Sequence, residues 1–573
     1  VGDIIKINGL SNALSFNRIE RGFDFKHYLN KQGVAFEIIN YEIKTLFSFP
    51  IRPLEISKQL LVAYSDNAKV LIDALIFNNK DYQSIIISNF SSLHLLFLFS
   101  SSGIHIYFLF KLTNIISGLF LSKQNERDVL CLLLLFPLFL LNLNRFIFYR
   151  LFIVKAVMIY NRVKLNKKYD YITILSASAL MFLLLNPFLI FNMSFYVSYG
   201  LSFYLYFLRP IIRRLKKSLR GIATFISIYI FLIPLRILTT NALMPLGIIV
   251  QFLVTPLISL YFVFAYIGVF IGGRGQVILN PLADLIAKIS NGLSRFNLGI
   301  YASDIGTILL LVFIVLIVAL IYALESKHRP LIRMCIISTL TLSFFVFVPY
   351  EQIYQQSVTF INVGQGDATL IIDRKTAILI DTGGSHYQDI AKEALIPFFR
   401  SKKIYDIDAL IITHDDFDHN GAKQSLIDNF LVKRVVDQAS AFPLRVGSIT
   451  LDNLNDGSYH QEDNEKSLVI AFTLMNKKWL LMGDASTRNE MLIIKQHPTL
   501  RADYLKIGHH GSNTSSDITF LQHIRPKEAI ISCGVNNFYG HPHHDVISNL
   551  EALDVVIRRT DIEGSIHYQS LAL

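Results

Sequence analysis

The chain has 573 residues, of which 52% are hydrophobic, with a mean hydropathy of +0.44 and a formal net charge of +11. This length and hydropathy exclude a single small soluble domain and favour several domains with a membrane-embedded part. The charge is uneven: residues 351–573 hold 28 acidic and 21 basic side chains, a net charge of −7, which leaves +18 to residues 1–350. Basic membrane loops on the cytoplasmic side explain much of that excess, and a polyanionic partner could add to it.

Residues 1–45 are interpreted as the end of a small β domain, OB-like in type, with a linking helix, so we expect further sequence upstream. Residues 46–350 follow as a polytopic α-helical membrane domain. Their apolar runs reach or approach the ~20 residues that cross a bilayer, and we expect roughly eight to ten crossings. The clearest runs lie at 171–191, 222–235, 243–272, 305–324 and 331–348, and shorter or broken ones at 104–121, 129–141, 151–160 and 194–208.

Residues 351–573 differ in character, since charged residues become frequent and short strand-like runs alternate with helical ones. We place the domain boundary near 349–357. The pattern predicts strands at 357–363, 368–372, 377–380 and 409–412. Gly-rich turns follow the first and third of these strands, and glycine there lets the backbone approach a ligand.

The most informative motif is the hexapeptide His-Asp-Asp-Phe-Asp-His at 414–419, which follows a buried-strand run. Imidazole nitrogen and carboxylate oxygen together suit Zn²⁺ or Mn²⁺. We expect His414 and Asp416 to face one metal ion, and Asp418 and His419 to face its neighbour. Two ions about 3.5–4 Å apart suit the in-line displacement of a phosphodiester. A solvated acidic turn is the plain alternative, and further site residues downstream argue against it.

Further candidates stand at later strand ends. Asp484 closes one strand and could bridge two metal ions. Of the next pair, we expect His510 to bind metal and His509 to face substrate, because adjacent side chains diverge in extended chain. His541, in a third His cluster, could donate to a phosphate oxygen or to the leaving group. The catalytic candidates are thus Asp418, Asp484, His509 and His541, and the candidates for contact with substrate or for positioning of the ligands are Gln365, Asp367, Asp381, Lys506 and Ser512.

These motifs, in this order along alternating elements, resemble the metallo-β-lactamase fold, an αββα sandwich with its metals at the loop edge. The resemblance covers about 210 residues. Asp416 stands where that family's first motif usually has a second His, which leaves the choice between zinc and manganese open. The only candidate for the family's middle His ligand is His460.

A narrower resemblance begins at 360–368, Phe-Ile-Asn-Val-Gly-Gln-Gly-Asp-Ala, and at 560–564, Thr-Asp-Ile-Glu-Gly. Together with the membrane half before them, these strings resemble the ComEC family of DNA uptake proteins in bacterial natural transformation. Four other regions fit that family, at 22–29, 94–105, 186–198 and 241–246, so the resemblance spans nearly the whole chain. The chain departs from the family at Asn362, where Asp is usual, in the long spacing from His94 to His105, and in lacking most of the OB-like domain.

The resemblance implies that one strand of DNA crosses the cytoplasmic (inner) membrane through the helices. The C-terminal domain would degrade the other strand with two divalent metal ions, Zn or Mn. The implied partners are double-stranded DNA outside, membrane lipid, a DNA receptor, and cytoplasmic strand-pulling or single-strand-binding proteins. Polar residues that could line the path are His94, His105, Asn186, Ser198 and Asn241, and each is alternatively a hydrogen-bond partner between helices.

Two basic segments bear on orientation, one at 209–220 and one at 327–333. If both lie in the cytoplasm, the last apolar run leads outward and the hydrolase domain lies on the outer face of the membrane.

Two other functions stay open at this point. A membrane-anchored metallo-phosphodiesterase could act on a lipid or wall-polymer substrate, but an anchor needs only one or two spans. A transporter with a degenerate, ligand-sensing hydrolase domain conflicts with the intact set of His414, Asp416, Asp418, His419 and Asp484.

Overall fold

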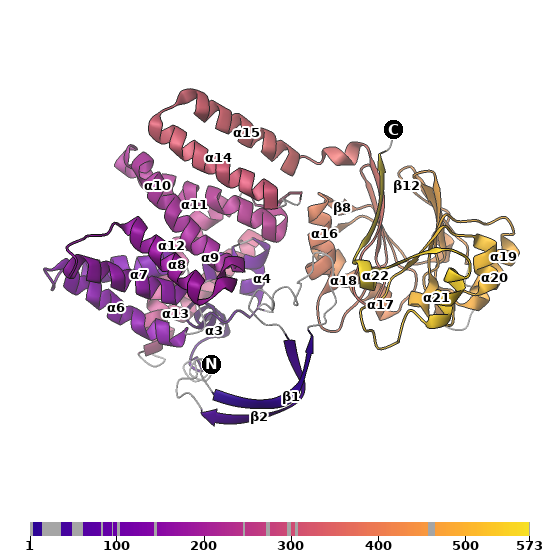
Figure 1. Ribbon diagram of the computed structural model, residues 1–573, viewed down its shortest axis with the longest axis horizontal. Helices are drawn as coiled ribbons and strands as arrows, with labels where there is room; N and C mark the ends of the chain where they lie inside the picture. Colours follow the sequence, from indigo (N-terminus) through magenta and orange to yellow (C-terminus); the bar gives the residue numbers. More distant parts are fainter. Residues whose placement is uncertain are drawn as a thin grey trace. The chain divides into compact units, whose positions relative to one another are not determined.

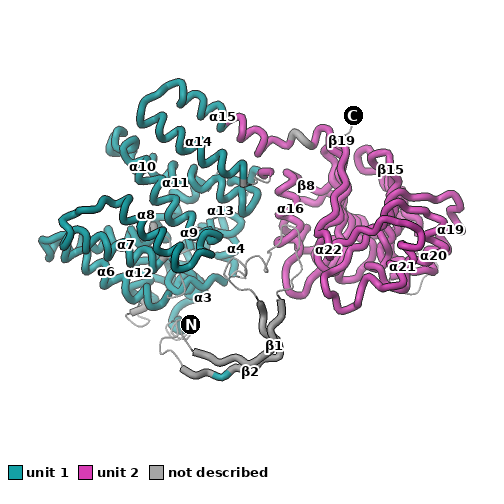
Figure 2. The backbone as a smooth tube through the Cα atoms, in the orientation of Figure 1, with its two compact units in different colours: residues 1–13, 29–300, 305–339 teal, residues 14–28, 301–304, 340–573 magenta. Residues whose placement is uncertain are grey.

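The computed structural model describes residues 4–13, 36–47 and 61–571, apart from 82–83, 94, 100–102, 143–145, 245–246, 271–274, 295–298, 304–306 and 456–463. It forms two compact units (Figure 2). The first comprises residues 1–13, 29–300 and 305–339, and the second residues 14–28, 301–304 and 340–573. The two units divide the chain between residues 339 and 340, within its last apolar helix. The domain boundaries expected from the sequence therefore stay predictions.

The first unit is helical, and every apolar run of the sequence overlaps a helix. Four described helices are long and apolar enough to cross a membrane, namely α11, α12, α14 and α15, and the apolar α8 is shorter. Eight to ten crossings therefore stay a prediction. The helices are α3 Asp66–Ile72, α4 Ile85–Ser92, α5 Gly103–Ser117, α6 Gln124–Leu141, α7 Phe146–Val163, α8 Tyr171–Leu185, α9 Met193–Phe195, α10 Leu201–Arg213, α11 Lys217–Thr240, α12 Gly247–Phe270, α13 Gln276–Ser294, α14 Thr307–Ser326 and α15 Arg329–Phe347, with shorter turns η1 Asp73–Phe77, η2 Leu96–Phe99, η3 Pro187–Phe191 and η4 Tyr196–Gly200.

Near the N-terminus, β1 (Ile4–Ala13) and β2 (Phe36–Phe47) pair antiparallel. This agrees with a β segment at the start of the chain, while the OB-like assignment stays a prediction. The expected linking helix and the string at 22–29 lie outside the described residues.

The second unit contains two sheets that face each other (Figure 1). The six-stranded sheet has the order β11-β9-β7-β6-β5-β19, and the seven-stranded sheet the order β12-β13-β14-β15-β16-β17-β18. Their bounds are β5 Gln355–Phe360, β6 Thr369–Asp373, β7 Thr376–Ile380, β9 Ala409–Ile411, β11 Val435–Val436, β19 Ile566–Leu571, β12 Leu444–Val446, β13 Ile449–Asn453, β14 Ile470–Leu474, β15 Lys477–Leu481, β16 Tyr504–Lys506, β17 Glu528–Ile531 and β18 Val556–Arg559. All four strands expected from the sequence are present, with ends shifted by up to three residues.

Strict alternation along the strands builds three apolar layers, because successive side chains point to opposite faces of a sheet. In β7, Ile378 packs between the two sheets, whereas Leu379 packs under the helices outside the first sheet. In β15, Trp479 lies between the sheets and Leu480 under the helices outside the second. The covering helices are α16 Ile396–Ser401 and α18 Lys423–Asn429 on one side, and α19 Thr487–Gln496, α20 Ile518–Ile524 and α21 His544–Glu551 on the other. The unit is therefore an αββα sandwich, as expected.

Candidate metal centre

The hexapeptide at 414–419 lies at the edge of the sandwich where several strands end. Strands β7 and β9 run parallel in the first sheet, and β15, β16 and β17 run parallel in the second. Each is followed at its carboxyl end by a polar loop. Because these ends meet at one edge, the loops bring together imidazoles and carboxylates that are up to about 140 residues apart.

His419, Asp484 and His414 form the centre of this group. Nε2 of His419 lies 3.1 Å from Oδ1 of Asp484, and Nε2 of His414 lies 3.8 Å from Oδ2 of the same carboxylate. All three side chains are buried. Ligand atoms of the three lie within 4.8 Å of one another, a spacing that one metal ion can bridge.

His510 joins the group from the second sheet. Its Nε2 lies 3.0 Å from Oδ2 of Asp418 and 3.8 Å from Oδ2 of Asp484. Its Nδ1 lies 2.9 Å from the carbonyl oxygen of Ser532, which can only accept, so Nδ1 carries a proton and a metal ion would bind through Nε2.

The expectation of extended chain at His509 and His510 was wrong. Both residues lie in a tight turn, η9 (Gly508–Gly511), with φ of 48° and 55°. The side chains still differ in environment, since that of His510 is 2% exposed and that of His509 is 27% exposed. The left-handed turn, rather than the alternation of a strand, therefore separates them. Nε2 of His509 nevertheless lies 3.8 Å from Oδ2 of Asp484.

Asp381 and Thr413 orient the histidines of the first sheet. Asp381 Oδ2 accepts from Nδ1 of His419 at 2.9 Å and from the hydroxyl of Thr413 at 2.8 Å. That hydroxyl, 3.1 Å from Nδ1 of His414, is left to accept from it. Both histidines thus carry their protons on Nδ1 and point Nε2 inward. Sequence reasoning found Asp381 but missed Thr413, although Thr413 immediately precedes the hexapeptide.

Asp367 lies on the loop before β6 and closes the centre from another side. Its Oδ1 lies 3.7 Å from Nδ1 of His510, and its Oδ2 forms a buried ion pair with Lys506. The backbone N–H of Asp367 donates to the carbonyl of Asp418 at 3.1 Å. At Gly366, with φ of 138°, a Cβ atom would lie 2.4 Å from that carbonyl oxygen. Glycine is therefore required for this loop to pack against the hexapeptide.

The protonation states suit a cation. Burial raises the pKa of Asp418, but the hydrogen bond from His510 outweighs it and holds the pKa at about 2. Burial likewise opposes ionisation of Asp484, yet the neighbouring imidazoles hold its pKa well below the usual range. Burial, followed by the neighbouring His419, lowers the pKa of His414. Burial opposes protonation of His419 and His510, but Asp484 and other nearby carboxylates outweigh it and raise the pKa of both imidazoles. A bound cation would displace these protons, because imidazole binds metal in its neutral form.

The unpartnered atoms give the clearest test of fit. Nε2 of His414, Nε2 of His419 and Oδ1 of Asp484 are buried and make no hydrogen bond with any described residue. At 3.1 Å, the His419 and Asp484 atoms are two acceptors that face each other, which costs free energy unless a proton or a cation lies between them. The donor set of nitrogen and carboxylate oxygen fits zinc or manganese.

The other candidates lie at the margin of the centre or beyond it. Asp416 approaches only His414 in the group, at 3.5 Å, and is about half exposed. The ring of His541 lies 5.8 Å from that of His509. Burial, followed by repulsion from His510, lowers the pKa of His541 to about 4, and its buried Nδ1 makes no hydrogen bond. Gln365 accepts from the N–H of Gly534, Ser512 is buried within 3.5 Å of Asn513, and His460 lies outside the described residues.

The polar residues expected to line a membrane path have separate environments. Both ring nitrogens of His105 are used inside the bundle, 2.9 Å from Ser259 Oγ and 2.6 Å from the carbonyl of Leu98. Exposed Asn186 caps η3 by accepting from Phe188, and buried Asn241 ends α11 in a left-handed conformation. His94 lies outside the described residues.

Ser198 has a partner that sequence reasoning missed. Nη1 of Arg150, on α7, donates to Ser198 Oγ at 2.5 Å, and Nη2 donates to Ser202. The guanidinium also lies over the ring of Tyr199, 4.8 Å from its centre. Arg150 is buried, and no carboxylate pairs with it among the described residues. Its signal in the sequence is a basic residue directly before the apolar run at 151–160.

The αββα sandwich and its edge cluster of His and Asp define the second unit as a metallo-β-lactamase type of domain. The metallo-beta-lactamase superfamily matches residues 361–448, and the competence protein family matches residues 77–328. The chain is thus similar to competence proteins of the ComEC family, with a metallo-β-lactamase domain after the helical region.

Several curated proteins are similar to this chain. ComE operon protein 3 of Bacillus subtilis is 27% identical over 456 residues, covering 69% of this chain and 58% of that protein. Recombination protein 2 of Haemophilus influenzae is 27% identical over 399 residues, covering 59% and 48%. Competence protein ComA of Neisseria gonorrhoeae is 28% identical over 229 residues, covering 37% and 32%. The chain thus spans between a third and three fifths of the length of these relatives.

Among solved structures, Igni18, a metallo hydrolase from Ignicoccus hospitalis, is 15% identical. The overlap covers 37% of this chain and 98% of that one, with a TM-score of 0.25. At that score the likeness says nothing about activity.

Proposed function

We propose that this protein carries a single strand of DNA across the cytoplasmic membrane and degrades the other strand at its metal centre. The observation that supports this most is the presence, in one chain, of a competence-family helical region and a hydrolase unit whose buried ligand cluster is intact. Neither an anchor alone nor a degenerate hydrolase accounts for both features.

The metal centre would act on a phosphodiester. Divalent metal ions bound there supply Lewis-acid stabilisation of a phosphoryl oxygen. The chain would hold them with His414, His419, Asp484, Asp418 and His510. Asp381 and Thr413 keep the first two imidazoles in the required tautomer.

His541 lies beside the cluster and would contact the substrate. Its lowered pKa keeps the ring neutral at physiological pH, so one ring nitrogen carries a proton and can donate to a phosphate oxygen. A neutral donor of this kind orients the phosphate without adding a charge that would compete with the metal ions for the ligands.

The helical unit offers a contact for the strand that crosses. Phosphate charge cannot enter hydrocarbon, so a translocated strand needs positive potential and donors along its path. Arg150 is a cation buried among neutral partners, Ser198, Ser202 and Tyr199. A buried charge without a counter-ion is costly, and a passing phosphate would supply that counter-ion.

The test is DNA uptake into a protected internal pool, measured with labelled double-stranded DNA in cells that carry or lack this protein. The full-length purified protein is assayed in parallel for nuclease activity on single- and double-stranded DNA with zinc or manganese. We expect both activities. Import that is equal without the protein would remove the channel function and leave a membrane-anchored phosphodiesterase acting on lipid or wall polymer as the better assignment.

A further inference from the structure

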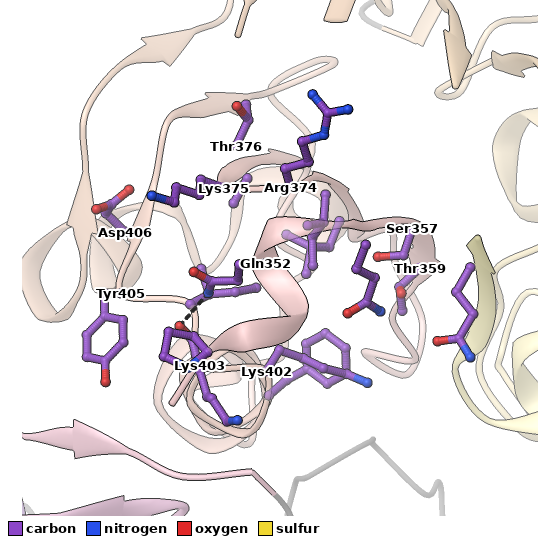
Figure 3. A pocket seen from close by; sticks show the side chains of 18 of the residues that line it. Gln352, Ser357, Thr359, Arg374, Lys375, Thr376, Lys402, Lys403, Tyr405 and Asp406 are labelled. Carbon is purple, nitrogen blue, oxygen red and sulfur yellow. Dashed lines mark hydrogen bonds between the residues drawn. The ribbon is translucent and has the colours of Figure 1, made fainter. Parts of the chain in front are cut away.

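A cavity of about 310 Å³ lies in the second unit at the end of the first sheet that is remote from the metal centre (Figure 3). Strand β6 separates the two sites. Asp367, in the metal centre, precedes this strand, and Arg374, at the cavity, follows it. Five residues of strand at about 3.3 Å each put roughly 17 Å between them. The cavity is therefore not part of the metal centre.

Basic side chains dominate the lining, although the second half of the chain has a net negative charge. Five lining residues are basic and Asp406 is the one acidic residue among them; the basic ones are Arg374, Lys375, Lys402, Lys403 and Lys433. Lys433 is neutralised by Asp406 at 2.7 Å and Asp408 at 2.8 Å.

Three of the cations are left without a counter-ion. Within the part of the chain that the structure describes, no acidic side chain forms an ion pair with Arg374, Lys375 or Lys402. Hydroxyl and amide groups of Ser357 and Gln352 complete a lining that can donate hydrogen bonds. The cavity is thus built for a small anion with several acceptor oxygens, such as a phosphate group.

One residue of the lining, Lys403, contacts the end of an apolar helix. Lys403 Nζ donates to the carbonyls of Phe345 at 3.3 Å and Val348 at 2.8 Å, which caps the end of α15. The N–H of Ser303, just before α14, donates to the carbonyl of Val346 at 2.9 Å. Both α14 and α15 are long and apolar enough to span a membrane. The cavity lining therefore contacts the end of one apolar helix, α15.

Two tyrosines contact each other at the edge of the cavity lining. Tyr301, six residues before α14, stacks on Tyr405 of the cavity lining, with ring centres 4.3 Å apart and planes 10° apart. The hydroxyl of Tyr405 accepts from the N–H of Tyr301 at 3.0 Å. Tyrosine is enriched at the boundary between lipid and water, where its ring lies among headgroups and its hydroxyl stays hydrated.

We propose that this cavity binds the phosphate headgroup of an anionic membrane phospholipid. Clustered Lys and Arg beside a membrane helix attract anionic lipid, and here the basic cluster is also hollow and lined with hydrogen-bond donors. A bound headgroup supplies the counter-charge that Arg374, Lys375 and Lys402 lack, and it ties the hydrolase unit to the bilayer surface. The inference does not depend on DNA transport.

The experiment uses the full chain in nanodiscs of phosphatidylcholine with a minor share of phosphatidylglycerol. The protein is released from the nanodiscs, and the lipids that stay bound to it are counted by native mass spectrometry. The cavity variant is Arg374→Gln/Lys375→Gln/Lys402→Gln. Its matched control removes three exposed cations elsewhere in the unit, Lys478→Gln/Lys495→Gln/Arg501→Gln. The single variant Lys375→Gln, at an exposed turn, guards against a folding failure of the triple variant.

We expect the parent and the control to retain phosphatidylglycerol in preference to phosphatidylcholine, and the cavity variant to retain it about tenfold less. The single variant should show a smaller loss. Competition with inorganic phosphate and with a short oligothymidylate separates the sources of phosphate. Equal retention of both lipids, or unchanged retention in the cavity variants, overturns the proposal. Displacement of the lipid by dilute inorganic phosphate or by the oligonucleotide overturns it too, in favour of a free-anion or nucleic-acid site.

Discussion

Nε2 of His419 and Oδ1 of Asp484 lie 3.1 Å apart in the interior of the second unit, and neither atom makes a hydrogen bond within the part of the chain that the structure describes. Nδ1 of His419 is held by the carboxylate of Asp381. Asp484 is held by its own backbone N–H, which donates to Ser467 Oγ at 3.2 Å. Two hydrogen-bond acceptors held face to face in this way form a site that fits a cation.

Replacing Asp484 should remove the metal. We expect Asp484→Ala, and likewise Asp418→Ala, to lose metal binding and phosphodiesterase activity while the unit stays folded, because each carboxylate belongs to a ligand cluster rather than to an apolar core. Metal content after dialysis, measured by mass spectrometry, checks this. The matched control is Asp452→Ala, an exposed carboxylate on β13. Parental metal content in either variant would show that the cluster is not the metal site.

Asp381 should act through His419 and not as a ligand of its own. Asp381→Asn keeps the size of the side chain but weakens its hold on the imidazole proton. We therefore expect metal affinity to fall about 10- to 100-fold, the usual effect of losing such a partner. Thr413→Val, which removes a hydroxyl that donates to the same carboxylate, should shift affinity in the same direction by less. Titration with a metal indicator gives both values, and unchanged affinity in Asp381→Asn contradicts the positioning role.

Arg150 should matter for DNA import but not for hydrolysis. We expect Arg150→Gln to reduce import of labelled DNA about tenfold or more, since a buried cation that meets a phosphate is lost. Arg150→Lys should retain part of the import, and Arg213→Gln, an exposed cation on α10, should retain all of it. Protein level in the membrane and nuclease activity of the purified chain serve as controls. Normal import by Arg150→Gln removes this residue from the path.

Glu490 should make the second unit less stable as pH rises. Its buried carboxylate accepts from the N–H groups of Ser516 and Asp517, but burial outweighs these bonds and raises its pKa to about 8 from 4.5. Between these values the folded state keeps a proton that the unfolded state has lost. The stabilisation of the folded state by this group is therefore fully present below pH 4.5 and is lost as the pH rises to about 8. The loss amounts to roughly 1.4 kcal/mol for each unit by which the folded pKa exceeds the unfolded pKa.

The comparison of parent and Glu490→Gln isolates this effect, because the amide does not titrate. The single Trp of the chain, Trp479, lies between the two sheets and reports unfolding of the second unit by fluorescence. We expect the melting temperature of the parent to fall between pH 5 and pH 8 more steeply than that of the variant. Parallel curves would show that Glu490 is not protonated in the folded state.

The hydrolase unit is predicted to lie outside the cytoplasmic membrane. A single cysteine at exposed Lys495, on α19, tests this, because Cys131, Cys335 and Cys533 are buried and give little background. We expect a membrane-impermeant thiol reagent to label Lys495→Cys in intact spheroplasts. Labelling that needs lysis places the unit in the cytoplasm and reverses the orientation derived from the basic loops.

Much of the metal centre could be predicted from the sequence, because its pieces are short and local. The hexapeptide at 414–419 puts its imidazoles and carboxylates within one turn of each other whatever the rest of the chain does. Strand patterns before Asp381, Asp484 and His510 place each of them at a carboxyl end, and parallel strands bring such ends to one edge. The αββα sandwich was predicted as well, through the resemblance of these motifs to the metallo-β-lactamase fold.

Only the tertiary structure decided how these pieces face one another. The left-handed turn at His509 and His510 depends on packing around η9, and the neighbouring residues in the sequence do not predict it. The partners of Arg150 lie about 50 residues away on η4 and α10, and the three unpaired cations of the cavity come from two turns that only folding brings together. Sequence spacing determines which groups stand at the end of a strand or helix. The distance between two such elements is set by the packing of side chains across the whole unit, and a local sequence pattern does not contain that information.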